Sequence, residues 1–136
     1  MKATKRLGIW MDHAVARLME YNIENFNIQT ITPDSNQLDH QEKAQHSESL
    51  LHNKESQVVR AYYNSLIAVI KDYDEVVLFG PTTAKTELFN LIREEHKYDK
   101  IKIETKTAGK MSFEEQHVFI LDYFKKALTY DNPFGK

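Results

Sequence analysis

Hydrophobic and polar residues near the start of the chain follow the short period of β-strands. Residues 7–11, 14–21 and 26–30 each carry an extended apolar pattern, and polar turns separate them. Three short strands joined by tight connections form an antiparallel meander. The first part of the sequence therefore predicts such a meander.

Further along, the apolar spacing changes to that of α-helices. Apolar residues at intervals of three and four predict helices at residues 58–73 and 84–92. The unbroken apolar run at 76–79 is typical of a buried parallel strand, and strict alternation at 101–105 predicts a half-exposed strand. A capping box starts a last helix at Ser112 and Glu115. The predicted core face of that helix comprises Phe113, His117, Ile120, Leu121, Phe124 and Leu128.

The order of these elements, β-β-β-α-β-α-β-α, predicts the fold class. Parallel strands need crossover helices, and such crossovers are right-handed. We therefore expect an α/β protein in which helices pack on a mixed five-stranded sheet, in the three-layer ribonuclease H-like layout. The length of 136 residues fits a single domain over residues 1–136.

Residues 33–54 interrupt this regular pattern. The segment has no apolar period and is rich in Asp, Glu, Gln, Ser and His. It is longer than the roughly 12–15 residues of an ordinary loop, so we expect a mobile polar loop. His40, His46 and His52 lie in it among carboxylates. They give a weak alternative of a zinc or nickel site, against the more frequent case of polar histidines without metal.

Composition narrows the classes of function. The net charge of −2 argues against a generally basic nucleic-acid coat but permits a local basic patch. The chain has no cysteine, which excludes disulfides, thiolate zinc sites and cysteine nucleophiles. No apolar run is long enough for a signal peptide or a membrane span. We therefore expect a cytoplasmic protein with no membrane partner, and we expect no cofactor.

The turn after the apolar run at 76–79 is the first candidate site. A Gly-Pro pair ends that strand, and the next helix opens with Thr82, Thr83 and Lys85. Backbone N–H groups at a helix start, a hydroxyl and an ammonium can hold a single phosphate, such as one of RNA. The second glycine of a Walker loop is missing, because Ala84 stands in its place. In the alternative interpretation, Pro81 occupies the first helical turn and the threonines cap the helix.

Lysines gather around the last predicted strand and form a second candidate site. Lys102, Lys106 and Lys110 are candidates for an RNA-binding edge, with further lysines at positions 97 and 100. Alternatively, lysines protect an exposed sheet edge against aggregation. A third interpretation is a homodimer that forms through this edge.

Asp12 and His13 follow the first strand, where a ribonuclease H-like nuclease carries its first catalytic aspartate. Two-metal hydrolysis needs several carboxylates that converge on the ions, but the strand at 76–79 ends without an acid. We therefore favour a hairpin turn in which Asp12 accepts backbone hydrogen bonds. A metal-dependent hydrolase that uses Asp12, His13 and the loop histidines is the alternative.

Three motifs resemble those of a group of small bacterial proteins labelled translational machinery protein, which are related to the middle domain of archaeal and eukaryotic release factors. Residues 10–16 match the opening W-x-D-H-x-x-A, and residues 80–88 match G-P-x-x-A-K-x-E-L. Residues 110–116 resemble the start of the closing helix more loosely. The motifs occur in the family's order and span most of the chain. The resemblance implies a ribonuclease H-like fold and a place near the ribosome.

The chain departs from the release factors at their catalytic tripeptide. Their middle domains use Gly-Gly-Gln to place water at the peptidyl-tRNA ester, but none of the four glycines here is adjacent to another. The sequence therefore does not support peptidyl-tRNA hydrolysis. We expect a non-enzymatic module that associates with the ribosome or with RNA, with the hydrolase and the homodimeric interaction module as alternatives.

Overall fold

A five-stranded sheet forms the middle layer of the fold, with the strands in the order β3-β2-β1-β4-β5. The computed structural model describes residues 4–21, 28–33 and 48–131. β1 pairs antiparallel with β2 and parallel with β4, while β3 is antiparallel to β2 and β5 is parallel to β4. The strand bounds are Arg6–Met11 (β1), Ala16–Glu20 (β2), Gln29–Ile31 (β3), Glu75–Gly80 (β4) and Lys102–Thr107 (β5). The predicted mixed sheet is confirmed.

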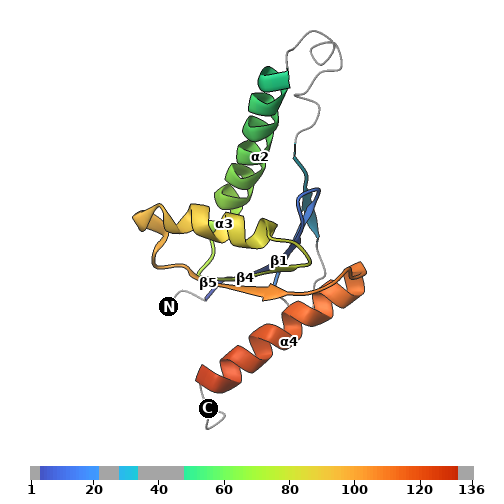
Figure 1. The fold of residues 1–136 in the computed structure, drawn as a ribbon. Helices are drawn as coiled ribbons and strands as arrows, with labels where there is room; N and C mark the ends of the chain where they lie inside the picture. The colour runs from blue at the N-terminus through green and yellow to red at the C-terminus, as the bar shows by residue number, and fades with distance from the viewer. Residues whose placement is uncertain (1–3, 22–27, 34–47, 132–136) are drawn as a thin grey trace.

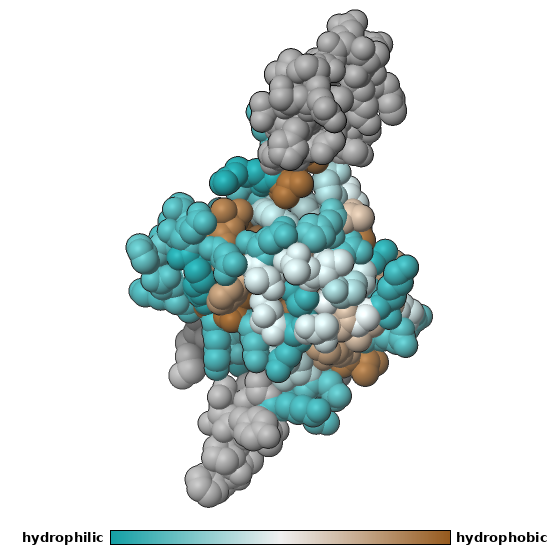
Figure 2. Space-filling model, in the orientation of Figure 1, coloured by the Kyte–Doolittle hydropathy of each residue, from teal (hydrophilic) through white to brown (hydrophobic). Residues whose placement is uncertain are grey.

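Helices cover both faces of this sheet (Figure 1). Helices α2 (Glu48–Ile70) and α3 (Ala84–Arg93) lie on one side, and α4 (Phe113–Asp131) lies on the other. A short 3₁₀ turn, η2 (His96–Tyr98), precedes β5. This three-layer arrangement is the predicted ribonuclease H-like one. Hydrophilic side chains cover much of the face shown in Figure 2, and none of the described helices combines the length and the apolar character needed to cross a bilayer.

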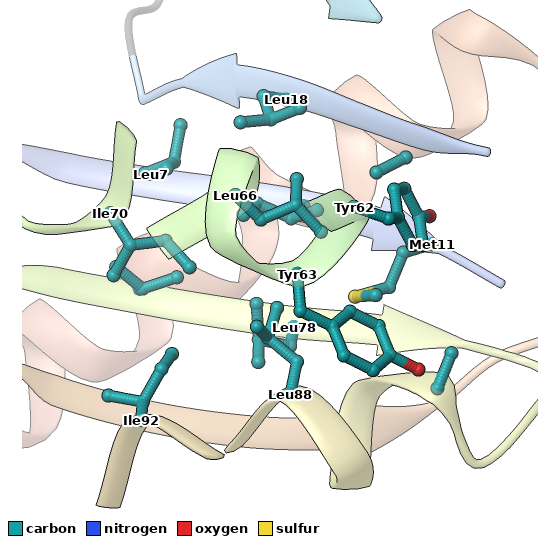
Figure 3. Packing of buried hydrophobic residues seen from close by; sticks show 14 of the residues in the cluster. Leu7, Met11, Leu18, Tyr62, Tyr63, Leu66, Ile70, Leu78, Leu88 and Ile92 are labelled. Atoms are coloured by element: carbon teal, nitrogen blue, oxygen red, sulfur yellow. The ribbon is translucent and has the colours of Figure 1, made fainter. Parts of the chain in front are cut away.

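Alternate residues of the central strands fill two separate cores, because successive side chains of a strand point to opposite faces. Leu7, Ile9 and Met11 of β1 pack with α2 and α3 in the larger core, part of which is shown in Figure 3. Trp10, Val77 and Phe79 point the other way and pack against Ile120 and Phe124 of α4. The expected core positions of Trp10, Tyr62 and Phe124 are confirmed, with exposed fractions of 4% or less.

The structure corrects the expected start of the long helix. α2 begins at Glu48, so residues 48–54 are helical, whereas we expected them in the polar loop. The hydrophobic period reports only the part of a helix that packs against other elements, and in Figure 1 the first turns of α2 extend away from the sheet. The rest of the expected loop, residues 34–47, lies outside the described residues.

The last helix follows its predicted start but not its full predicted core face. The Ser112 N–H donates to Oε1 of Glu115 at 2.8 Å, and the Glu115 N–H donates to Oγ of Ser112 at 3.2 Å, which confirms the capping box. Phe113 is 46% exposed, and Gln116 is buried instead. Its Nε2 donates to the Met111 carbonyl at 2.9 Å, while its buried Oε1 accepts no hydrogen bond from the described residues.

Candidate functional site

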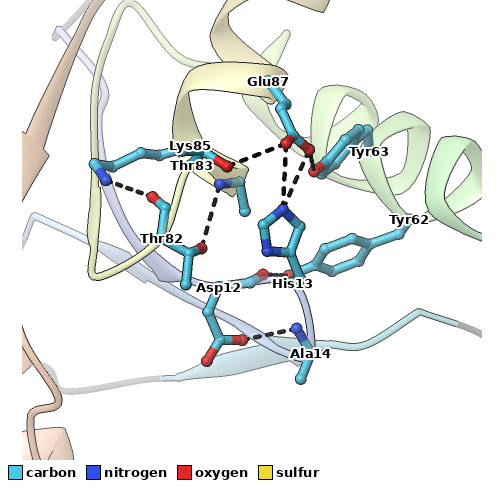
Figure 4. Close-up of polar contacts among 10 residues, drawn as sticks. Asp12, His13, Ala14, Tyr62, Tyr63, Thr82, Thr83, Lys85 and Glu87 are labelled. Carbon is cyan, nitrogen blue, oxygen red and sulfur yellow. Dashed lines mark hydrogen bonds and ion pairs between the residues drawn. The ribbon is translucent and has the colours of Figure 1, made fainter.

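The candidate site lies where β1 and β4 end side by side in the middle of the sheet. The two strands are parallel, and Trp10 is paired with Phe79 near their carboxyl ends. Open α/β sheets bind ligands beyond the carboxyl ends of their strands. The turn after β1, the turn after β4 and the first turn of α3 all meet here, and α2 contributes two tyrosines (Figure 4).

Asp12 organises the turn after β1. Its Oδ1 accepts hydrogen bonds from the N–H groups of Ala14 at 2.8 Å and Val15 at 2.9 Å. The Tyr62 hydroxyl, from α2, donates to the Asp12 backbone carbonyl at 2.8 Å. These bonds confirm the interpretation of Asp12 as the acceptor of a hairpin turn. They also explain why β2 begins at Ala16 and not at residue 14, because the turn occupies the N–H groups of residues 14 and 15.

Glu87 is the centre of the polar cluster, and it receives hydrogen bonds from two other elements and from the N-cap of its own helix. The Tyr63 hydroxyl on α2 donates to its Oε1 at 2.6 Å, and the Thr83 hydroxyl donates to its Oε2 at 3.2 Å. His13 Nε2, on the turn after β1, lies 3.3 Å from Oε1 and 3.4 Å from Oε2. Glu87 therefore links the turn after β1 to α2 and α3.

This geometry shifts the acid–base properties of the cluster. The hydrogen bond from Tyr63 is the largest cause that lowers the pKa of the Glu87 carboxyl below its ordinary value, and those from His13 and Thr83 act in the same direction. Burial, together with the hydrogen bond to Glu87, raises the pKa of the Tyr63 hydroxyl. Glu87 is thus held as an ionised acceptor facing a neutral tyrosine.

The chemistry of the cluster favours structure and binding. The hydroxyl protons of Tyr63 and Thr83 are both directed at the Glu87 carboxylate. Because the pKa of Glu87 is lowered, this carboxylate is a weak base and is poorly suited to activate either oxygen as a nucleophile. His13 is about half exposed and its Nε2 is engaged by the same carboxylate. Among the described residues, no group of three or more His, Asp or Glu side chains is placed to hold a metal ion. The predicted ligands His40 and His46 lie outside that part of the chain, and the side chain of His52 is not described.

The turn after β4 requires glycine at its first position. Gly80 has φ of 153°, and a Cβ there would lie 2.1 Å from the Met11 carbonyl oxygen. The helix begins at Ala84, so Pro81 precedes it and does not occupy its first turn as the alternative interpretation held. Thr83 stands at the N-cap position but makes no capping bond, because its hydroxyl is directed at Glu87.

The structure brings Thr82, Thr83 and Lys85 together within one turn. Thr82 Oγ1 accepts a hydrogen bond from the Ala84 N–H at 3.2 Å. Lys85 is only 7% exposed, and its ammonium donates to the Thr82 carbonyl at 2.5 Å. The Lys85 ammonium therefore satisfies a carbonyl of its own turn. An anion that bound here would compete with that carbonyl for the lysine.

The predicted lysines lie on the edge strand β5 and just after it. Lys102 and Lys106 are exposed and alternate with the half-buried Ile103 and Thr105, as the sequence predicted. Lys106 Nζ is 3.3 Å from Oε2 of Glu104, so part of its charge is balanced. Lys110 follows β5 and is exposed. Glu104 lies on the same exposed face of β5, between Lys102 and Lys106.

Sequence reasoning did not single out Glu87 or Tyr63 as functional residues. Glu87 was visible as the acidic position of the segment G-P-x-x-A-K-x-E-L. Tyr63 follows Tyr62, which the helical period assigns to the core, and nothing in the spacing separates their roles. Only the packing of α2 against α3 places the Tyr63 hydroxyl on Glu87.

Comparison with known proteins identifies relatives by structure only. No protein family profile and no curated protein matches the sequence. The Pelota protein of Thermoplasma acidophilum has a similar structure, with a TM-score of 0.52 and 16% identity over 86% of this chain. Pelota of Archaeoglobus fulgidus gives a TM-score of 0.55 with 8% identity over 90% of this chain. The chain spans 32% of the length of each Pelota protein. At these identities the likeness shows a shared fold.

Proposed function

We propose that this protein is a non-enzymatic module that associates with the ribosome or with RNA in the cytoplasm. The observation that carries the proposal is the fold shared with two Pelota proteins, which are release-factor-like proteins of translation. The sequence motifs resemble those of a family related to release-factor middle domains. The order of the sequence motifs and the fold shared with the Pelota proteins thus both favour a protein related to release factors.

The row formed by Lys102, Lys106 and Lys110, which we call the β5 lysine row, is the surface we assign to RNA. Lys102 and Lys106 share one face of an edge strand, about 13 Å apart at the rise of an extended chain. Exposed lysines along such an edge contact phosphates of a nucleic acid backbone without reading its sequence. The N–H groups of the first turn of α3, with Thr82, Thr83 and Lys85, supply a second anion contact in this proposal.

An enzymatic role gains less support from the geometry. Asp12 is committed to its turn, and Glu87 is surrounded by donors that satisfy it. The hydrolase alternative needs converging carboxylates or histidines, and the described part of the chain offers no such group. We therefore retain binding as the function.

Co-sedimentation with ribosomes from a cell lysate tests the proposal, at low and at high salt. We expect the protein to migrate with a ribosomal particle at low salt and to dissociate at high salt, because phosphate contacts release counterions. In the double variant Lys106→Gln/Lys110→Gln, co-sedimentation should weaken and its salt dependence should become less steep.

A charge-matched control separates a local effect from a change of net charge. The double variant Lys71→Gln/Lys126→Gln removes the same charge from exposed positions outside the β5 lysine row. It should behave like the unmodified protein. If both double variants lose co-sedimentation equally, the β5 lysine row is not the contact. If the unmodified protein stays at the top of the gradient at every salt concentration, the ribosomal role is wrong.

A further inference from the structure

Apolar side chains line one flank of α4, from the exposed Val118 to Phe119, which packs on the sheet. A groove of about 400 Å³ lies there, and we call it the α4 groove. Its lining residues recur at intervals of three and four, so they share one side of the helix. They are Met111, Glu114, Glu115, Val118, Phe119 and Asp122. Val118 is 60% exposed, although a surface helix is normally polar on its outer side.

Exposure of hydrophobic side chains in the described part of the chain is greatest at the groove. Of the three exposed large hydrophobic residues, Val118 is the most exposed at 60%, against 46% for Phe113 and 40% for Val59. Phe113 is not a lining residue, because its ring packs against the Arg17 guanidinium of β2 at 4.8 Å. Figure 2 shows hydrophobic surface at the lower right, over α4, with hydrophilic atoms around it. Such local concentration marks a surface that contacts a partner.

The walls of the groove are fixed before any partner binds. The Phe119 ring stacks on Phe79 of β4, with centroids 4.2 Å apart and planes 13° apart. Glu115 is held by the capping box, and the Met111 carbonyl accepts a hydrogen bond from the buried Gln116. A partner therefore does not have to order these groups, which lowers the entropic cost of association.

The charge of the groove selects the kind of partner. Three of its lining residues are carboxylates, and none is a lysine or arginine. RNA is disfavoured, because its phosphates would lie beside Glu114, Glu115 and Asp122. An apolar side chain flanked by lysine or arginine is complementary both to the apolar lining residues and to the carboxylates of the groove. This preference is opposite to that of the β5 lysine row.

We propose that the α4 groove binds a basic segment of a partner protein, which inserts an apolar side chain against Val118 and Phe119 and sets lysine or arginine against the carboxylates. The proposal goes beyond RNA association and does not depend on it. A second copy of this chain fits less well. Its β5 lysine row supplies cations, but the apolar residue between them, Ile103, is half-buried in its own sheet.

Binding of synthetic peptides tests the assignment. The probe is a fluorescent helical peptide of leucine and lysine, with leucines spaced to form one apolar face. Its two controls are an isomer of equal composition without that face and a peptide in which glutamate replaces lysine. We expect saturable binding of the first peptide only. NMR chemical shift changes should centre on residues 111–122.

Variants of the groove make the test specific. Val118→Lys removes the exposed apolar contact and adds a repelling charge, and the exposure of Val118 means that folding should be unaffected. The double variant Glu114→Gln/Asp122→Asn removes two rim charges and should weaken binding about tenfold at low salt. The matched control Glu94→Gln/Glu95→Gln removes two carboxylates beside another groove, between α2 and α3, and should leave the affinity unchanged.

Each contrary outcome overturns the proposal. Equal affinity of both lysine peptides would mean that charge alone drives binding, and unchanged affinity in Val118→Lys would place the contact elsewhere. If the protein sediments as a dimer that Val118→Lys dissociates, the occupant is a second copy. The variant Lys106→Gln/Lys110→Gln should bind the peptide normally even if it loses the ribosome, which separates this inference from the proposed function.

Discussion

The Tyr63 hydroxyl on α2 donates a hydrogen bond of 2.6 Å to the Glu87 carboxylate on α3. This contact is the largest cause of the lowered pKa of Glu87. In the variant Tyr63→Phe the donor is lost, so we expect the pKa of Glu87 to rise toward its ordinary value of 4.5. An NMR titration of the Glu87 side-chain carboxyl carbon measures this directly. A pKa that does not move would show that His13 and Thr83 hold the carboxylate without Tyr63.

The same contact predicts the direction of the pH dependence of stability. A carboxyl whose pKa is lower in the folded state stabilises the fold above its unfolded pKa, and this contribution is lost as the pH falls through the folded pKa. The free energy of unfolding should therefore decrease below about pH 4.5 and do so less steeply in Tyr63→Phe. Denaturant titrations at several pH values give the slope of the free energy of unfolding against pH for both proteins. The variant Glu87→Gln is the reference that lacks the titrating group.

Lys85 offers a test of whether its turn is structural or binds anions. Its ammonium donates to the Thr82 carbonyl, and the side chain is buried. Lys85→Met keeps the length of the side chain but removes the donor, so the Thr82 carbonyl loses a charged partner. We expect the free energy of unfolding to fall by about 1–3 kcal/mol, measured by urea denaturation.

RNA affinity of the folded Lys85→Met protein then separates the two roles. A weaker salt-dependent affinity in a protein that remains folded would support an anion contact at this turn. Unchanged affinity would assign Lys85 to the structure alone and leave the β5 lysine row as the phosphate contact. Lys85→Arg, which keeps a charged donor, is the conservative control.

Features encoded by neighbours in sequence were predictable, and features that depend on packing were not. The Asp12 turn and the box of Ser112 and Glu115 involve residues at most three positions apart, so residue type and spacing specify them. The mixed five-stranded sheet with helices packed on it followed from the order of elements along the chain and from the rule for crossovers. These local and topological rules account for the correct fold class.

The Glu87 cluster required the tertiary structure. His13 lies 74 positions before Glu87 in the sequence, and Tyr63 lies 24 positions before it. No hydrophobic period in the chain relates these residues. Phe113 shows the same limit in the core, because its spacing fits the apolar face of α4 while the helix end projects it outward at 46% exposure. The apolar pattern reports which residues favour burial, and the packing of elements decides which of them achieve it.

Gly8 shows how tightly α4 packs on the sheet. A Cβ at Gly8 of β1 would lie 2.2 Å from Cγ1 and 2.4 Å from Cδ1 of Ile120. Ile120 is fully buried, so it has little room to move. We expect Gly8→Ala to lower the free energy of unfolding by about 1–3 kcal/mol through overpacking. Gly109→Ala is the matched control, because nothing lies within 4 Å of the added Cβ.

A compensating change distinguishes this steric cause from a backbone effect of alanine. Ile120→Ala removes Cγ1, Cγ2 and Cδ1, the three atoms that a Cβ at Gly8 would meet. The double variant should therefore lose less stability than the sum of the two single losses. The two residues are in contact, and their effects should therefore be non-additive in a double-mutant cycle. Urea denaturation of the four proteins measures the coupling. Strictly additive losses would mean that α4 does not approach β1 at Gly8 as closely as the structure shows.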